Sequence, residues 1–79
     1  GLHILPGSAE TEAALALPGT KVLMKSGQQL PAILHSLESR GLLAESMLVE
    51  NCGLPEERTF ADLTEKPDSK GYFTTVIIP

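Results

Sequence analysis

The chain has 79 residues, one cysteine and a formal net charge of −4 at pH 7. This length allows one small domain, near the lower limit for a core without disulfide or metal staples. A single cysteine cannot form an internal disulfide, and the sequence lacks the paired Cys and His residues of a zinc site. The excess of acidic residues argues against a nucleic-acid partner. We expect a cytoplasmic protein without a membrane partner, because no apolar run approaches the roughly 20 residues of a bilayer span and no signal peptide is visible. Since the chain starts at Gly1, we also expect a piece of a longer protein.

The first part of the chain alternates strand-like and helix-like segments. Residues 2–5 are apolar and stop at a Pro-Gly pair, which predicts a short strand. Ser8 is a good N-cap, and Glu10 and Glu12 suit the first turn of a short helix that ends at 17–19. Residues 20–25 have the composition of a second strand, which Ser26 and Gly27 end.

The clearest helix begins near Leu30. Apolar residues follow the i, i+3, i+4, i+7 stripe of a helix with one buried face, at Leu30, Ile33, Leu34 and Leu37. Gly41 is suited to the position just past its end. His35 lies off the stripe, and we expect it on the surface.

Strands dominate the second half. We expect strands at 46–50 and, more weakly, at 59–63, followed by a turn-rich loop at 64–71. The unbroken β-branched and aromatic run 72–78 predicts a central strand buried on both faces.

This order predicts an α/β fold, a small mixed sheet of about five strands with crossover helices. Helices between strands at this spacing imply parallel pairing of the first three strands. The last two strands are expected to be antiparallel neighbours, because a loop of about eight residues joins them.

The segment from Val49 to Arg58 changes abruptly from apolar to polar. Asn51 and Gly53 tolerate left-handed backbone and Pro55 fixes φ, so a turn is expected directly after a buried strand. Such a turn either holds a flat, polar-edged ligand on bare backbone groups or simply joins two strands.

Catalytic patterns are missing from the sequence. It has no Gly-rich phosphate loop, no Ser/His/Asp or Cys/His arrangement and no metal cluster. Cys52, the one candidate nucleophile, has no histidine near it in sequence. We expect the chain alone to catalyse nothing.

Several segments in series resemble the C-terminal domain of the tetrapyrrole methylases. They are VLMK at 22–25, LP at 30–31, GLL at 41–43, VEN at 49–51 leading into LPEER at 54–58, and YFTT at 72–75. The resemblance implies the C-terminal half of a two-domain, S-adenosylmethionine-dependent methyltransferase that binds its cofactor between the domains. It implies that the substrate is a tetrapyrrole, precorrin-2 or cobalt-factor II, and that the enzyme needs no metal cofactor. The partners implied are an N-terminal domain of the same chain and a second copy in a homodimer.

The resemblance also implies the adenine side of the cofactor pocket. Its walls would come from the ends of three strands, with main-chain groups reading the adenine edge. The residues implied are Met24, Lys25, Asn51, Cys52, Gly53, Phe73 and Thr74.

Two alternatives remain open. One keeps the family and changes the substrate to precorrin-4 or uroporphyrinogen. The other is a small α/β regulatory or interaction module without enzymatic function. A Gly-rich strand–turn–helix motif upstream of Gly1 would favour the enzyme, and its absence would favour the module.

Overall fold

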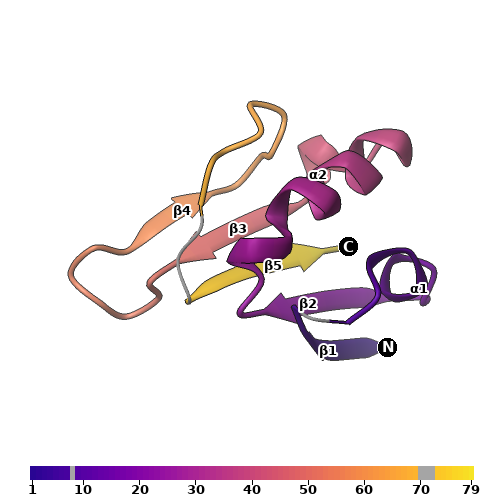
Figure 1. Ribbon diagram of the computed structural model, residues 1–79, viewed down its shortest axis with the longest axis horizontal. Coiled ribbons are helices and arrows are strands. Elements are labelled where there is room, and N and C mark those ends of the chain that lie inside the picture. The colour runs from indigo at the N-terminus through magenta and orange to yellow at the C-terminus, as the bar shows by residue number, and fades with distance from the viewer. Residues whose placement is uncertain (8, 70–72) are drawn as a thin grey trace.

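The computed structural model describes residues 1–7, 9–69 and 73–79 as one mixed sheet with two helices (Figure 1). The five strands have the spatial order β1–β2–β5–β3–β4. Strands β1 and β2 pair in parallel, and all other neighbours pair antiparallel. The strands are β1 (Leu2–Pro6), β2 (Thr20–Met24), β3 (Met47–Glu50), β4 (Arg58–Phe60) and β5 (Thr74–Ile78). The α/β prediction is confirmed.

The predicted strand pairing is wrong in two places. Strand β3 does not pair with β2, because β5 lies between them. The last two strands are not neighbours either, since β4 pairs with β3. The physical reason is that β4 closes a hairpin with β3 across a short turn, and the apolar β5 then gains a partner on each side. The central position predicted for β5 is correct.

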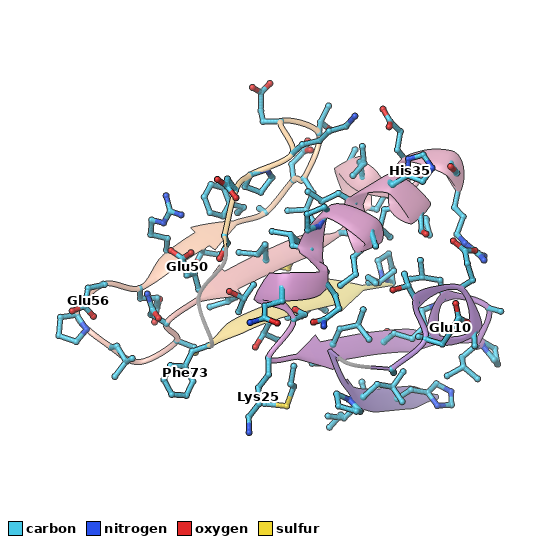
Figure 2. All side chains as sticks on the ribbon, viewed as in Figure 1. Glu10, Lys25, His35, Glu50, Glu56 and Phe73 are labelled. Carbon is cyan, nitrogen blue, oxygen red and sulfur yellow. The ribbon has the colours of Figure 1, made fainter. Side chains whose placement is uncertain are left out.

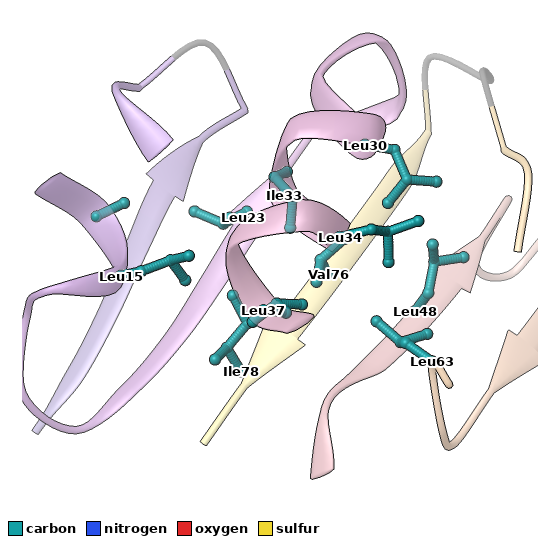
Figure 3. Close-up of a cluster of buried hydrophobic side chains, with 11 residues drawn as sticks. Leu15, Leu23, Leu30, Ile33, Leu34, Leu37, Leu48, Leu63, Val76 and Ile78 are labelled. Atoms are coloured by element: carbon teal, nitrogen blue, oxygen red, sulfur yellow. The ribbon is translucent and has the colours of Figure 1, made fainter. Parts of the chain in front are cut away.

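Two helices cover one face of the sheet, α1 (Thr11–Leu15) and α2 (Leu30–Ser39). Their apolar side chains meet those of the sheet in a single cluster (Figure 3). Leu37 of α2 and Leu48, Val76 and Ile78 of the sheet are fully buried. Leu63 joins this core although it lies beyond β4, held by a hydrogen bond from its N–H to the Leu43 carbonyl.

The ends of the helices follow local chemistry. The predicted cap Ser8 lies outside the described residues, and Glu10 caps α1 by accepting hydrogen bonds from the N–H groups of Glu12 and Ala13. Gly41 has φ +70° just past α2, and the N–H of Leu42 bonds the Leu37 carbonyl at 2.9 Å. This is the Schellman arrangement that a glycine at that position favours. Short 3₁₀ turns occupy Gly27–Gln29 and Leu43–Glu45.

On the second face of the sheet, the described residues place apolar side chains but no helix. Ile4, Val22, Ile77 and Met47 are paired in register across four neighbouring strands. Ile4 is 63% exposed and the other three are half-buried. Burial of β5 on both faces is therefore wrong, because both helices lie on the opposite face. Among the described residues, no helix is long and apolar enough to cross a membrane.

Candidate functional site

Three strand ends meet at one edge of the sheet. Strands β2 and β3 both run antiparallel to β5, which lies between them, so their carboxyl ends flank the start of β5. This places Met24 and Lys25, Asn51, and Phe73 and Thr74 at the same edge. The structure thus brings together residues that are separated by up to about fifty positions in sequence.

Ser26 joins the first strand end to the third. Its N–H donates to the Thr74 carbonyl at 2.9 Å. Its Oγ lies 3.0 Å from that carbonyl and 3.1 Å from the Leu23 carbonyl, and the residue is fully buried. Sequence reasoning treated Ser26 only as the end of a strand, because its main partner lies 48 residues away.

Gly7 supports Lys25 from the side of β1. The Gly7 N–H donates to the Met24 carbonyl at 2.5 Å. A Cβ on Gly7 would lie 2.6 Å from the Lys25 carbonyl oxygen and 2.5 Å from the Ser26 Cα. Only glycine fits there without displacing the backbone of residues 25 and 26.

The turn after β3 is joined to the same edge by Asn51. Its N–H donates to the Phe73 carbonyl at 2.9 Å, and its φ is +56°. Gly53 also has positive φ, at +82°, so the prediction that both residues adopt left-handed backbone is confirmed. The Gly53 N–H donates to Glu57 Oε1 at 2.8 Å. Cys52 and Gly53 continue outward as exposed residues of the β3–β4 hairpin.

Exposure at the edge is uneven. Met24 is 43% exposed and Phe73 is 55% exposed, whereas Thr74 is fully buried. Figure 2 shows Lys25 and Phe73 projecting from this edge, with Glu56 further out on the hairpin turn. The Thr74 hydroxyl pairs with the Ser69 hydroxyl at 2.8 Å. The edge therefore offers apolar side chains and backbone to a ligand, and the Thr74 side chain faces inward.

A polar network supports the edge from behind, and sequence reasoning did not find it. Glu50 accepts a hydrogen bond from Arg58 Nε at 2.6 Å and another from the Ser69 hydroxyl. The hydrogen bonds from Arg58, and then from Ser69, lower the pKa of Glu50 below its ordinary value. Because Ser69 also touches Thr74, this network connects the β3–β4 hairpin to the start of β5.

The seven candidate residues define what the edge can do chemically. None carries a carboxylate or an imidazole, and the ionisable side chains among the seven are the Lys25 ammonium group and the Cys52 thiol. The described residues also contain no group of three His, Cys, Asp or Glu side chains placed to hold a metal ion. What remains is a surface that can position a ligand.

A separate cleft of about 380 Å³ lies on the helix-covered side of the sheet. Its walls come from α2 and from residues 66–69, and His35 lines it as an exposed residue. An ion pair between Lys66 Nζ and Glu38 at 2.9 Å joins the two walls. This cleft is the competing location for a small ligand.

No family model matches the chain. Among curated proteins, it is similar to a precorrin-2 C(20)-methyltransferase from Sinorhizobium sp., with 37% identity over an alignment of 82 residues. The alignment covers 99% of this chain and 33% of the relative, so the chain spans about a third of the relative's length.

Two solved structures share its fold. Both are of a uroporphyrin-III C-methyl transferase from Thermus thermophilus, with TM-scores of 0.68 and 0.65 at 20% identity. The superposed regions cover 99% of this chain and 41% and 39% of theirs, and the first of the two is a complex with S-adenyl homocysteine. Likeness in sequence along nearly the whole chain and likeness in fold confirm the expected resemblance: this chain is similar to the tetrapyrrole methylases and has the fold of their C-terminal domain.

Proposed function

We propose that this chain is the C-terminal, cofactor-contacting domain of an S-adenosylmethionine-dependent tetrapyrrole C-methyltransferase, with precorrin-2 or cobalt-factor II as substrate. The observation that carries the proposal is the edge where the ends of β2 and β3 meet the start of β5. The 37% identity to the precorrin-2 methyltransferase supports this substrate over uroporphyrinogen, because the uroporphyrin enzyme shares the fold at only 20% identity.

The edge fits one side of a flat, polar-edged cofactor. The half-exposed side chains of Met24 and Phe73 offer apolar contact to a ring. A Cβ on Gly53 would meet nothing within 4 Å, so space is open beside that backbone. The N–H groups of Asn51 and Gly53 already donate within the domain. At these two residues, adenine would therefore meet carbonyl oxygens, which keep a second lone pair after one bond.

When bound, S-adenosylmethionine supplies a methyl group on a sulfonium for in-line displacement by a nucleophilic carbon. Such a displacement depends on orientation more than on acid–base groups. The residues of this chain would contribute orientation alone: Ser26 and Asn51 hold the three strand ends in place. The lack of carboxylates and imidazoles among the seven candidate residues is consistent with that role.

The remaining contacts would come from partners. We propose that an N-terminal domain of the full-length protein holds the ribose, the methionine carboxylate and the macrocycle. We further propose a homodimer in the cytoplasm. The exposed row of apolar side chains through Ile4 on the second sheet face supports an additional covering layer.

Titration of S-adenosylhomocysteine into the ¹⁵N-labelled chain tests the proposal. Amide shifts clustered at residues 24–25, 51–53 and 73–74 would support it. Shifts confined to the cleft around His35 would instead favour a binding module without enzymatic function. In the two-domain protein, identifying the methylated product distinguishes precorrin-2 from the other tetrapyrroles.

A further inference from the structure

Lysine occupies a backbone conformation that is unfavourable for it at the candidate edge. Among the described residues, three that are not glycine have positive φ: Lys25 at +56°, Asn51 at +56° and Lys66 at +52°. Asparagine visits this region readily, whereas lysine does so at a cost. Two of the three lie at the edge, on either side of the start of β5. Unfavourable backbone conformations gather at functional sites when the surrounding structure enforces them.

The neighbours of Lys25 enforce its conformation. On one side, Gly7 packs so closely that a Cβ there would lie 2.6 Å from the Lys25 carbonyl oxygen. On the other side, the buried Ser26 is held by Thr74 through its N–H and its hydroxyl. Glycine would adopt this φ at lower cost, so what lysine adds at this position is its side chain. That side chain is exposed and projects from the same edge as Phe73 (Figure 2).

Charge decides which ligand suits the Lys25 ammonium group. The methyl donor carries a sulfonium and an ammonium group against one carboxylate, and this net positive charge disfavours a further ammonium group beside it. Tetrapyrroles of the uroporphyrin type carry several carboxylates around an apolar ring, which an ammonium group attracts. The carboxylates of Glu56 and Glu57 lie on the exposed hairpin turn and disfavour an anion on that side.

We propose that the Lys25 side chain binds a carboxylate at the rim of the tetrapyrrole substrate. The inference rests on the proposed function and assigns the Lys25 side chain to the substrate, leaving its main chain for the cofactor. Lys25 is thereby a substrate-binding residue with no part in the chemistry of methyl transfer.

The test measures binding of uroporphyrin III to the chain, by porphyrin absorbance and amide NMR shifts, with three variants. Lys25→Gly should weaken binding about two- to fivefold without lowering the denaturation midpoint, because it removes a charge and also relieves the backbone. Lys25→Arg should keep the affinity. Lys66→Gly is the control: it removes an exposed lysine with φ +52° that lines the cleft and pairs with Glu38, away from the edge, and it should leave the affinity unchanged.

Three results would overturn the inference: no binding of uroporphyrin III, equal affinity of Lys25→Gly and the original chain, or equal losses in Lys25→Gly and Lys66→Gly. The last would mean either a response to net charge only or binding in the cleft that Lys66 lines. S-adenosylhomocysteine, titrated in parallel, separates this inference from the proposed function. If it shifts the edge while Lys25→Gly has no effect on uroporphyrin binding, the inference fails and the proposed function stands. If neither ligand shifts the edge, both fail.

Discussion

Replacing Gly53 by valine should weaken cofactor binding more than it weakens folding in the proposed two-domain enzyme. Gly53 has φ +82°, and a left-handed residue other than glycine costs about 1–2 kcal/mol, with β-branching adding to this. A Cβ there meets nothing within 4 Å, so no clash adds to the backbone term. A domain of this size has a free energy of unfolding of about 4–12 kcal/mol, and the variant should still fold.

The effect on binding has a different origin. The valine side chain would fill the open space beside Gly53 that the cofactor ring needs, and we expect the dissociation constant for S-adenosylhomocysteine to rise more than about tenfold. Gly41→Val is the matched control. Gly41 has φ +70°, equally open space, and a place just past α2, at the end of that helix away from the candidate edge.

For both variants, we would measure the denaturation midpoint and, by calorimetry, the dissociation constant for S-adenosylhomocysteine. Similar losses of stability, with lost affinity only in Gly53→Val, would support a cofactor contact at this turn. If Gly53→Val loses stability and keeps its affinity, the turn is merely structural and the proposed wall at residues 51–53 is wrong.

Three further outcomes are expected. The 79-residue chain alone should show no methyltransferase activity and bind S-adenosylhomocysteine with a dissociation constant near 1 mM, about −4 kcal/mol, by NMR titration; tight binding would show that the domain is self-sufficient. The chain should unfold in one cooperative step at a low denaturant midpoint, and Leu37→Ala, at a fully buried position, should cost about 2–5 kcal/mol, enough to leave it largely unfolded if its stability is modest. Glu50 has a lowered pKa, so its stabilising effect is present above its ordinary value of 4.5 and is lost as pH falls through the lower folded value. Glu50→Gln should flatten that acid-side loss in denaturation midpoints, and an unchanged pH profile would count against the network.

Local signals predicted the elements that local forces determine. The apolar stripe from Leu30 to Leu37 predicted α2, and Gly41 marked its end through a φ that glycine favours. The turn at Asn51 and Gly53 followed from the same preference. These features depend on contacts within about four residues, which a sequence displays directly.

Strand order and the supports of the site depend on distant contacts. The insertion of β5 between β2 and β3 depends on which apolar strand gains two partners, and strand spacing does not carry that information. Ser26 reads as a strand breaker until Thr74 is placed beside it. The hydrogen bonds of Ser69 with Glu50 and with Thr74 likewise join three segments that are distant in sequence. Nothing local to the end of β3, to the loop or to the start of β5 indicates that they meet.

The hydrogen bonds within the edge indicate that it orients a ligand but does not enclose one. Hydrogen bonds from Ser26 and Asn51 bind the strand ends to each other, so the edge keeps its shape without a ligand and loses little entropy on binding. The same bonds use N–H groups that would otherwise read a ligand, and the apolar side chains at the edge are half-exposed. Affinity must then come from a second surface that removes water from the edge, because an exposed hydrogen bond contributes only about 1 kcal/mol. A rigid edge with few free donors is thus best suited to a pocket completed by another domain.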